Sequence, residues 1–122
     1  DWDSRTGAMV DDRQHARVLG YIDKGKAEGA ELLTGGRALR TETGGYYIEP
    51  TVFDRVRNDM TIAREEIFGP VLSTITFKTT EEAFRIANDT IYGLAAAIWT
   101  KDISVAMKAA KTIKAGSVWI NC

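Results

Sequence analysis

Few side chains in this sequence could carry out covalent or acid–base chemistry. The single cysteine, Cys122, ends the chain directly after an apolar segment, and the single histidine, His15, lies between Arg13 and Arg17. A catalytic thiol needs a lowered pKa and a fixed neighbourhood, and a catalytic histidine needs a partner at a suitable spacing. We therefore predict a structural or incidental role for Cys122 and a solvated helix position for His15.

The adjacent carboxylates Glu65 and Glu66 are a second candidate, because paired carboxylates can serve as general acid and base. Neighbouring residues usually point apart, however, so the residue types alone predict surface charges. Phe68, which precedes Gly69 and Pro70, is by the same reasoning a packing residue at a turn.

Composition excludes several classes of protein. One cysteine and one histidine cannot form an internal disulfide or a His/Cys metal cluster. A net charge of −1 and a pI of about 5.9 give no basic surface for nucleic acid or an anionic membrane. No apolar run is long enough to span a bilayer, and no N-terminal signal is visible. We expect a soluble, cytoplasmic protein without metal, nucleic-acid or membrane partners.

The first half of the chain predicts one helix and several short strands. The helix runs from Asp11 to Gly29, with Val18, Ile22 and Gly25 on one face. Strands are expected at residues 30–34 and 46–53, the second broken at Pro50. Residues 37–45 are predicted to form a loop, and residues 57–69 a polar stretch with a possible single helical turn.

The second half predicts strand, helix, strand, helix and strand in turn. Strands are expected at residues 71–77, 94–99 and 117–121. Thr79 and Glu82 form a capping-box pattern that opens a helix through about Asn88. A second helix spans 102–114, with an apolar stripe at Ile103, Ala106, Met107, Ala110 and Ile113.

Helices between strands favour parallel pairing with right-handed crossovers. The apolar run at 94–99 is typical of a strand that is covered on both faces. The predicted fold class is therefore α/β, a mostly parallel sheet with helices on both faces, in a single partial domain over residues 1–122.

Four motifs carry a resemblance to a known family. The chain strongly resembles the aldehyde dehydrogenase superfamily in GGYYIEPTVF (44–53), AREEIFGPV (63–71), ANDTIYGLAAAIWTKD (87–102) and AGSVWINC (115–122). The motifs occur in the family's order and at about its spacing, and the likeness also covers residues 17–36. One departure is Ala8, where many relatives carry proline.

The resemblance implies a mechanism. In the family a cysteine thiolate attacks the aldehyde, hydride passes to nicotinamide, and a glutamate-activated water releases the acid from the thioester. The nucleophile, that glutamate and most of the dinucleotide site precede the portion matched here. We expect this chain to be a fragment with no catalytic residue of its own, to be inactive alone, and to derive from a parent that uses NAD or NADP.

Individual residues take their expected roles from the resemblance. Glu66 matches the glutamate that hydrogen-bonds the nicotinamide-side ribose, and Phe68 the aromatic that packs near the nicotinamide ring. Gly69 and Pro70 would fix the backbone that presents them. Asn121 matches an asparagine near the catalytic loop, with a structural polar role, and Cys122 falls at a position that is not the nucleophile.

The resemblance also leaves alternatives open. The sequence at residues 6–14 and 118–122 looks closest to the betaine-aldehyde and amino-aldehyde dehydrogenase groups. The resemblance also implies a homo-oligomer that acts on a small aldehyde. A rival hypothesis is a non-catalytic α/β domain that associates through exposed strand edges and an apolar face. A third, a small nucleotide-binding module, requires NAD affinity in the isolated chain.

Overall fold

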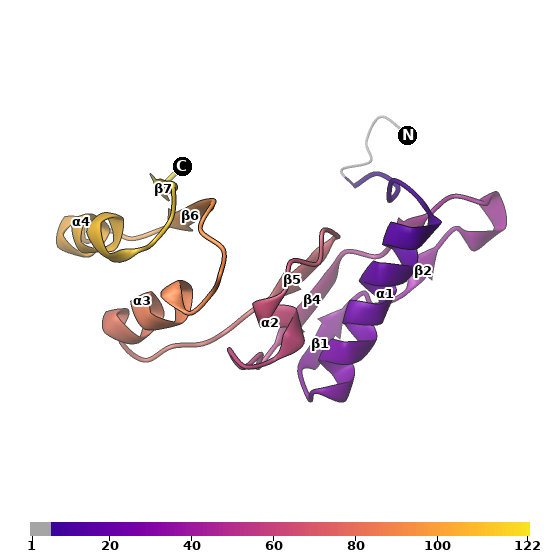
Figure 1. Ribbon diagram of the computed structural model, residues 1–122, viewed down its shortest axis with the longest axis horizontal. Coiled ribbons are helices and arrows are strands. Elements are labelled where there is room, and N and C mark those ends of the chain that lie inside the picture. The colour runs from indigo at the N-terminus through magenta and orange to yellow at the C-terminus, as the bar shows by residue number, and fades with distance from the viewer. Residues whose placement is uncertain (1–5) are drawn as a thin grey trace. The chain divides into compact units, whose positions relative to one another are not determined.

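The computed structural model describes residues 6–122, which divide into two compact units. The first unit extends to Thr76 and the second runs from Phe77 to Cys122. Each unit contains both helices and strands, so the predicted α/β class is confirmed (Figure 1). Within the described residues, no helix is long and apolar enough to cross a membrane.

The first unit is built around helix α1 and a three-stranded sheet. Its elements are α1 (Asp12–Ala27), β1 (Glu31–Thr34), β2 (Ala38–Leu39), η1 (Thr41–Thr43), β3 (Tyr47–Ile48), β4 (Thr51–Asp54), α2 (Thr61–Arg64) and β5 (Val71–Ser73). The sheet has the order β1–β4–β5, with β1 antiparallel and β5 parallel to the central β4. The possible single turn predicted within residues 57–69 is present as α2.

Helix α1 begins and packs as its sequence predicts. The Asp11 side chain accepts a hydrogen bond from the Gln14 backbone N–H at 2.7 Å and so caps the helix. Val18, Ile22 and Gly25 are buried, as expected for one face. A Cβ on Gly25 would lie only 3.0 Å from the Ile62 side chain, so the missing side chain lets α2 approach α1 closely.

The core of the first unit lies between α1, β4 and α2. Phe53 of β4 is fully buried, and Met60 and Ile62 close the core from the side of α2. Thr51 is the only polar residue buried among those described. Its hydroxyl accepts from the Gly36 N–H at 2.9 Å and donates to the Glu49 carbonyl at 2.8 Å, so its burial leaves no polar group unpaired.

The loop predicted for residues 37–45 is wrong in part. β2 pairs antiparallel with β3, Ala38 opposite Ile48 and Leu39 opposite Tyr47, and η1 lies between them. The polar composition obscured this hairpin because each strand is only two residues long. The break at Pro50 is confirmed, since β3 ends at Ile48 and β4 begins at Thr51.

The second unit contains α3 (Thr80–Asn88), β6 (Ala95–Ile98), α4 (Ile103–Thr112) and β7 (Ser117–Ile120). β6 and β7 pair in parallel, in register from Ala95↔Ser117 to Ile98↔Ile120. The predicted cap of α3 is confirmed: Thr79 accepts from the Glu82 N–H, while the Glu82 carboxylate accepts from the Lys78 N–H. The predicted strand–helix–strand unit across α4 is therefore present.

Two details of the second unit differ from the prediction. β6 alternates between exposed and half-buried residues, so the residues that the structure describes do not cover it on both faces. The buried face of α4 consists of Ala106 and Ala109, whereas Ile103 and Met107 of the predicted stripe are exposed. The small alanines are therefore the inward residues of α4, and the larger apolar residues lie outside.

The sheet is also divided more finely than expected. β5 pairs with β4 of the first unit, and β6 pairs with β7, so the two parallel pairings belong to separate sheets. Of the four strand pairings within residues 6–122, two are antiparallel. β2 and β3 form an antiparallel hairpin, and β1 and β4, which precede and follow that hairpin in the sequence, also pair antiparallel.

Candidate functional site

Four of the predicted site residues lie in one loop of the first unit, between α2 and β5. This segment, residues 65–70, is here called the EEIFGP loop. Its Ile67 side chain is buried in the core of the unit, whereas Glu66 and Phe68 are exposed on either side of it. The alternation anchors the loop through Ile67 and leaves a carboxylate and an aromatic ring accessible.

Helix α1 holds the backbone of the EEIFGP loop through side-chain hydrogen bonds. Gln14 Nε2 donates to the carbonyl oxygens of Ile67 at 3.0 Å and of Phe68 at 2.9 Å. Arg17 Nη2 donates to the carbonyl oxygen of Glu66 at 2.9 Å. Three consecutive carbonyls of the loop are therefore bound by two side chains of one helix.

Tyr21 adds a side-chain contact from the next turn of α1. Its hydroxyl donates to Glu65 Oε2 at 2.6 Å, and its ring is buried. The Arg17 guanidinium carbon lies 5.6 Å from the ring centroid, and Lys24 Nζ lies 5.0 Å from it, both within the range of a cation–π interaction. Glu65 is thus hydrogen-bonded to α1, although both residues of the acidic pair are exposed.

Phe68 has an unusual backbone conformation. Its φ is 55°, in the left-handed region that bulky residues avoid, and its side chain is 70% exposed. Left-handed backbone at a non-glycine residue costs on the order of 1–3 kcal/mol and persists only where the surroundings hold it. An exposed ring gains little from burial, so packing within this chain does not explain the strain.

Gly69 and Pro70 form the end of the loop. A Cβ on Gly69 would lie 2.5 Å from the Val18 side chain, so only glycine allows the loop to approach α1 this closely. The Pro70 carbonyl accepts from the Thr51 N–H at 2.8 Å, and the Val71 N–H donates to the Gly69 carbonyl at 2.8 Å. The loop therefore enters β5 through a tight turn tied to β4.

The exposed groups of the EEIFGP loop are suited to binding a ligand rather than to covalent chemistry. No hydrogen bond or ion pair to the Glu66 carboxylate is made by the residues that the structure describes. A free carboxylate can accept from two vicinal hydroxyls, and an exposed aromatic ring can pack on a flat ligand ring. Groups of His, Cys, Asp and Glu suited to a metal ion are absent from residues 6–122.

Asn121 lies in the second unit, directly after β7, and its hydrogen bonds join it to residues at the end of β6. Its Oδ1 accepts from the Thr100 N–H and its Nδ2 donates to the Thr100 carbonyl, both at 2.9 Å. Its own N–H donates to the Ile98 carbonyl at 2.9 Å, with φ at 55°. These bonds join Asn121 to the residues that follow and end β6, while its role near a catalytic loop stays a prediction.

Cys122 and His15 differ in their surroundings. Cys122 is a free, exposed thiol. His15 is half-buried rather than solvated: its Nε2 lies 3.3 Å from the Tyr47 carbonyl oxygen, and its ring centroid lies 5.9 Å from that of Tyr46. The helix face that carries His15 packs on β3, which the short polar context did not indicate.

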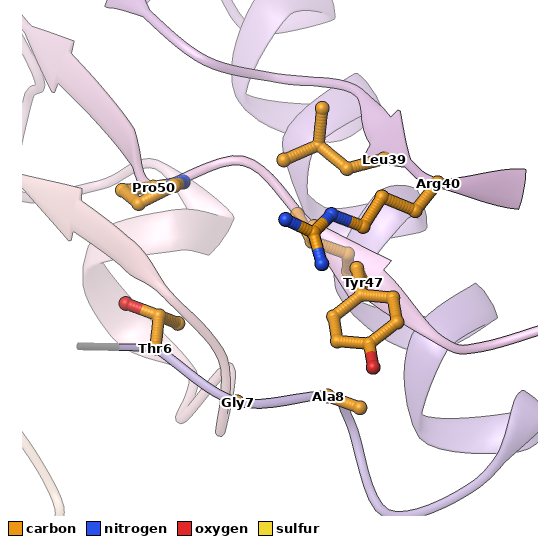
Figure 2. Close-up of a pocket in the computed structure, with 8 residues that line it drawn as sticks. Thr6, Gly7, Ala8, Leu39, Arg40, Tyr47 and Pro50 are labelled. Carbon is orange, nitrogen blue, oxygen red and sulfur yellow. The ribbon is translucent and has the colours of Figure 1, made fainter. Parts of the chain in front are cut away.

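A pocket of about 320 Å³ lies elsewhere in the first unit, between residues 6–8 and the β2–β3 hairpin. Figure 2 shows Arg40 beside the Tyr47 ring in this pocket, with the guanidinium carbon 5.9 Å from the ring centroid. Ala8, the departure from the family's proline, also lines it. Neither Glu66 nor Phe68 does, so the pocket is separate from the EEIFGP loop.

The residues of α1 that hold the loop carry no recognisable sequence motif. Gln14, Arg17 and Tyr21 were not singled out, although they recur at intervals of three and four residues. This spacing places them along one side of the helix, next to the apolar face. Polar side chains at the border of an apolar stripe were the available signal, but nothing in the local pattern identifies their partner.

Comparison with known proteins identifies the family to which this sequence is similar. The model of the aldehyde dehydrogenase family matches residues 1–122. Aldehyde dehydrogenase 1 of Tanacetum cinerariifolium is 53% identical over 119 residues, which cover 98% of this chain and 23% of that protein. The chain thus spans about a quarter of the length of the relatives it matches.

Solved structures agree with the sequence matches. The aldehyde dehydrogenase KauB from Pseudomonas aeruginosa is 58% identical, with a TM-score of 0.97 over 99% of this chain and 24% of that one. An indole-3-acetaldehyde dehydrogenase in complex with NAD⁺ is 56% identical, with the same TM-score and coverage. Family match, sequence identity and fold agree over essentially the whole chain, and the chain belongs to the aldehyde dehydrogenase family.

Proposed function

We propose that this chain is the nicotinamide-side part of an NAD(P)-dependent aldehyde dehydrogenase that oxidises an aldehyde to a carboxylic acid. The observation that carries the proposal is the EEIFGP loop, which is anchored from α1 yet leaves Glu66 and Phe68 exposed. Strain retained at an exposed side chain is typical of a functional position. The family match favours this hypothesis over the non-catalytic association domain.

Glu66 and Phe68 would have complementary tasks. The Glu66 carboxylate would accept hydrogen bonds from ribose hydroxyls, and the Phe68 ring would limit the positions of the nicotinamide. Bound NAD(P) supplies the acceptor for hydride in this chemistry. Gly69 and Pro70 hold the backbone behind both groups.

The reacting thiol and the general base would come from outside these 122 residues. Cys122, at a position that is not the family's nucleophile, has no hydrogen-bond partner in the described structure that could activate it. We therefore expect the isolated chain to be inactive. A small aldehyde as the substrate, a homo-oligomeric parent and a cytoplasmic location stay predictions.

An activity assay tests this proposal. The isolated chain, given NAD and a panel of aldehydes, should form no NADH, whereas the complete enzyme that contains it should. In the complete enzyme, Glu66→Gln and Phe68→Ala should each raise the KM for NAD roughly tenfold, the equivalent of one or two lost contacts.

Two controls accompany the assay. Glu42→Gln removes an exposed carboxylate of η1, in the β2–β3 hairpin, and should leave the KM for NAD unchanged. Turnover by the isolated chain that disappears on Cys122→Ser would overturn the proposal.

A further inference from the structure

The presentation of Phe68 depends on one side chain of α1. Gln14 Nε2 donates to the carbonyls of Ile67 and Phe68, which are the peptide groups on either side of the Phe68 Cα. A primary amide nitrogen carries two N–H groups, so one side chain can bind both carbonyls. These two bonds hold the residue whose backbone is strained at a φ of 55°.

The helix that carries Gln14 is a rigid support. Val18 and Ile22 are fully buried in the core of the first unit, and the Asp11 cap binds the N–H of Gln14 itself. Gln14 is half-buried, so its amide bonds compete less with water than those of an exposed residue would. The position of the two carbonyls is therefore set by the core, through α1.

We propose that Gln14 is a positioning residue for cofactor binding, which holds the Phe68 backbone in the left-handed conformation that presents its ring. Arg17 acts beside it by binding the Glu66 carbonyl. The inference rests on the proposed function of Glu66 and Phe68. The hydrogen bonds of the Gln14 side chain go to backbone carbonyls of the loop, so its proposed effect on the cofactor passes through the loop.

Gln14→Glu is the sharpest test, because it keeps the shape of the side chain and removes both N–H donors. In the complete enzyme at neutral pH it should raise the KM for NAD roughly tenfold, as the loss of two neutral hydrogen bonds allows. The KM for the aldehyde should change much less. Gln14→Ala should have a similar effect, and Arg13→Ala, which alters an exposed neighbour on the same helix, should have none.

The pH dependence separates positioning from general damage. Two facing carbonyl oxygens favour the protonated form of an introduced carboxyl group, which can then donate one hydrogen bond. As the pH falls, the KM for NAD of the Gln14→Glu enzyme should approach that of the unmodified enzyme. The KM for NAD of the Gln14→Ala enzyme should not approach it in this way over the same pH range. An unchanged KM in Gln14→Glu, or the same pH response in both variants, would overturn the inference.

Separate measurements check whether each variant folds and whether the proposed function of Glu66 and Phe68 holds. Circular dichroism melting checks each variant, and a Gln14→Glu enzyme that fails to fold at neutral pH would assign Gln14 a purely structural role and so overturn the inference. If Glu66→Gln and Phe68→Ala leave the KM for NAD unchanged, the proposed function itself fails. If those two variants raise it and the Gln14 variants do not, only the positioning role fails.

Discussion

At the scale of single residues, the EEIFGP loop separates stability from binding. Phe68 combines a strained backbone with an exposed ring, so the fold gains little from the side chain that it holds. Ile67, one residue earlier, is buried and contributes to the core. Adjacent residues of one loop therefore serve different ends, which is common where a rigid scaffold presents a binding group.

The strain at Phe68 can be measured with two substitutions. Phe68→Gly relieves the left-handed backbone, whereas Phe68→Ala retains it, and both remove the ring. Chemical denaturation should find the glycine variant more stable than the alanine variant by about 1 kcal/mol. Both variants should lose cofactor affinity to the same degree, and equal stabilities would show that the backbone at this position is not strained.

At the scale of elements, the close approach of the EEIFGP loop to α1 depends on the absence of a side chain at Gly69. Gly69→Ala would place a Cβ 2.5 Å from the fully buried Val18. Overpacking of this kind costs about 1–3 kcal/mol. We expect that loss in the free energy of unfolding, measured by denaturant titration.

A second substitution checks the cause of this loss. Val18→Ala makes room for the new methyl group, so the Gly69→Ala/Val18→Ala double variant should lose less stability than the two single losses added together. Strict additivity would contradict the steric explanation.

The junction between β4 and β5 gives a prediction about acid stability. A hydrogen bond from the Arg55 backbone N–H, together with one from the Thr74 hydroxyl, holds the pKa of Asp54 below its ordinary value. A lowered pKa in the folded state stabilises the fold above the unfolded pKa near 3.8, and that contribution is lost as the pH falls through the folded value.

Asp54→Asn should therefore flatten the fall in stability below about pH 4, measured by denaturation across an acid pH series. Asp59→Asn, which alters an exposed carboxylate in the same unit, is the matched control. If stability falls with pH as steeply in Asp54→Asn as in the unmodified protein, a folded-state role for this carboxylate is contradicted.

At the scale of the whole chain, the two units differ in how much core they possess. In the first unit the core cluster includes Val18, Ile22, Phe53, Met60 and Ile62. In the second unit the buried apolar side chains among the described residues are those of Phe84, Ala106 and Ala109. Large apolar residues of the second unit lie exposed instead, at Ile91, Leu94, Trp99, Ile103 and Trp119.

Exposed apolar surface of this extent favours association. We expect light scattering to detect concentration-dependent self-association of the isolated chain, and we expect its second unit to exchange amide hydrogens faster than its first. Replacing Leu94 and Trp99 with serine should reduce the association, whereas Leu33→Ser in the first unit serves as a control. A stable monomer with uniform protection would contradict this prediction.

The sequence by itself determined the local elements and the family. Caps and periodicity act over three or four residues, so the beginnings of α1, α3 and α4 at Asp11, Thr79 and Asp102 could be read directly. The break at Pro50 follows from its missing N–H. Four motifs identified the family, and through it Glu66 and Phe68.

Tertiary structure alone decided which distant groups meet. The bonds from Gln14 to the carbonyls of residues 67 and 68 span more than fifty residues of chain, and no local pattern encodes such a partner. The pairing of β5 with β4, and the inward face of α4 at Ala106 and Ala109, likewise depend on what packs nearby. Local propensity fixes what an element is, whereas burial of surface against a particular neighbour fixes where its side chains go.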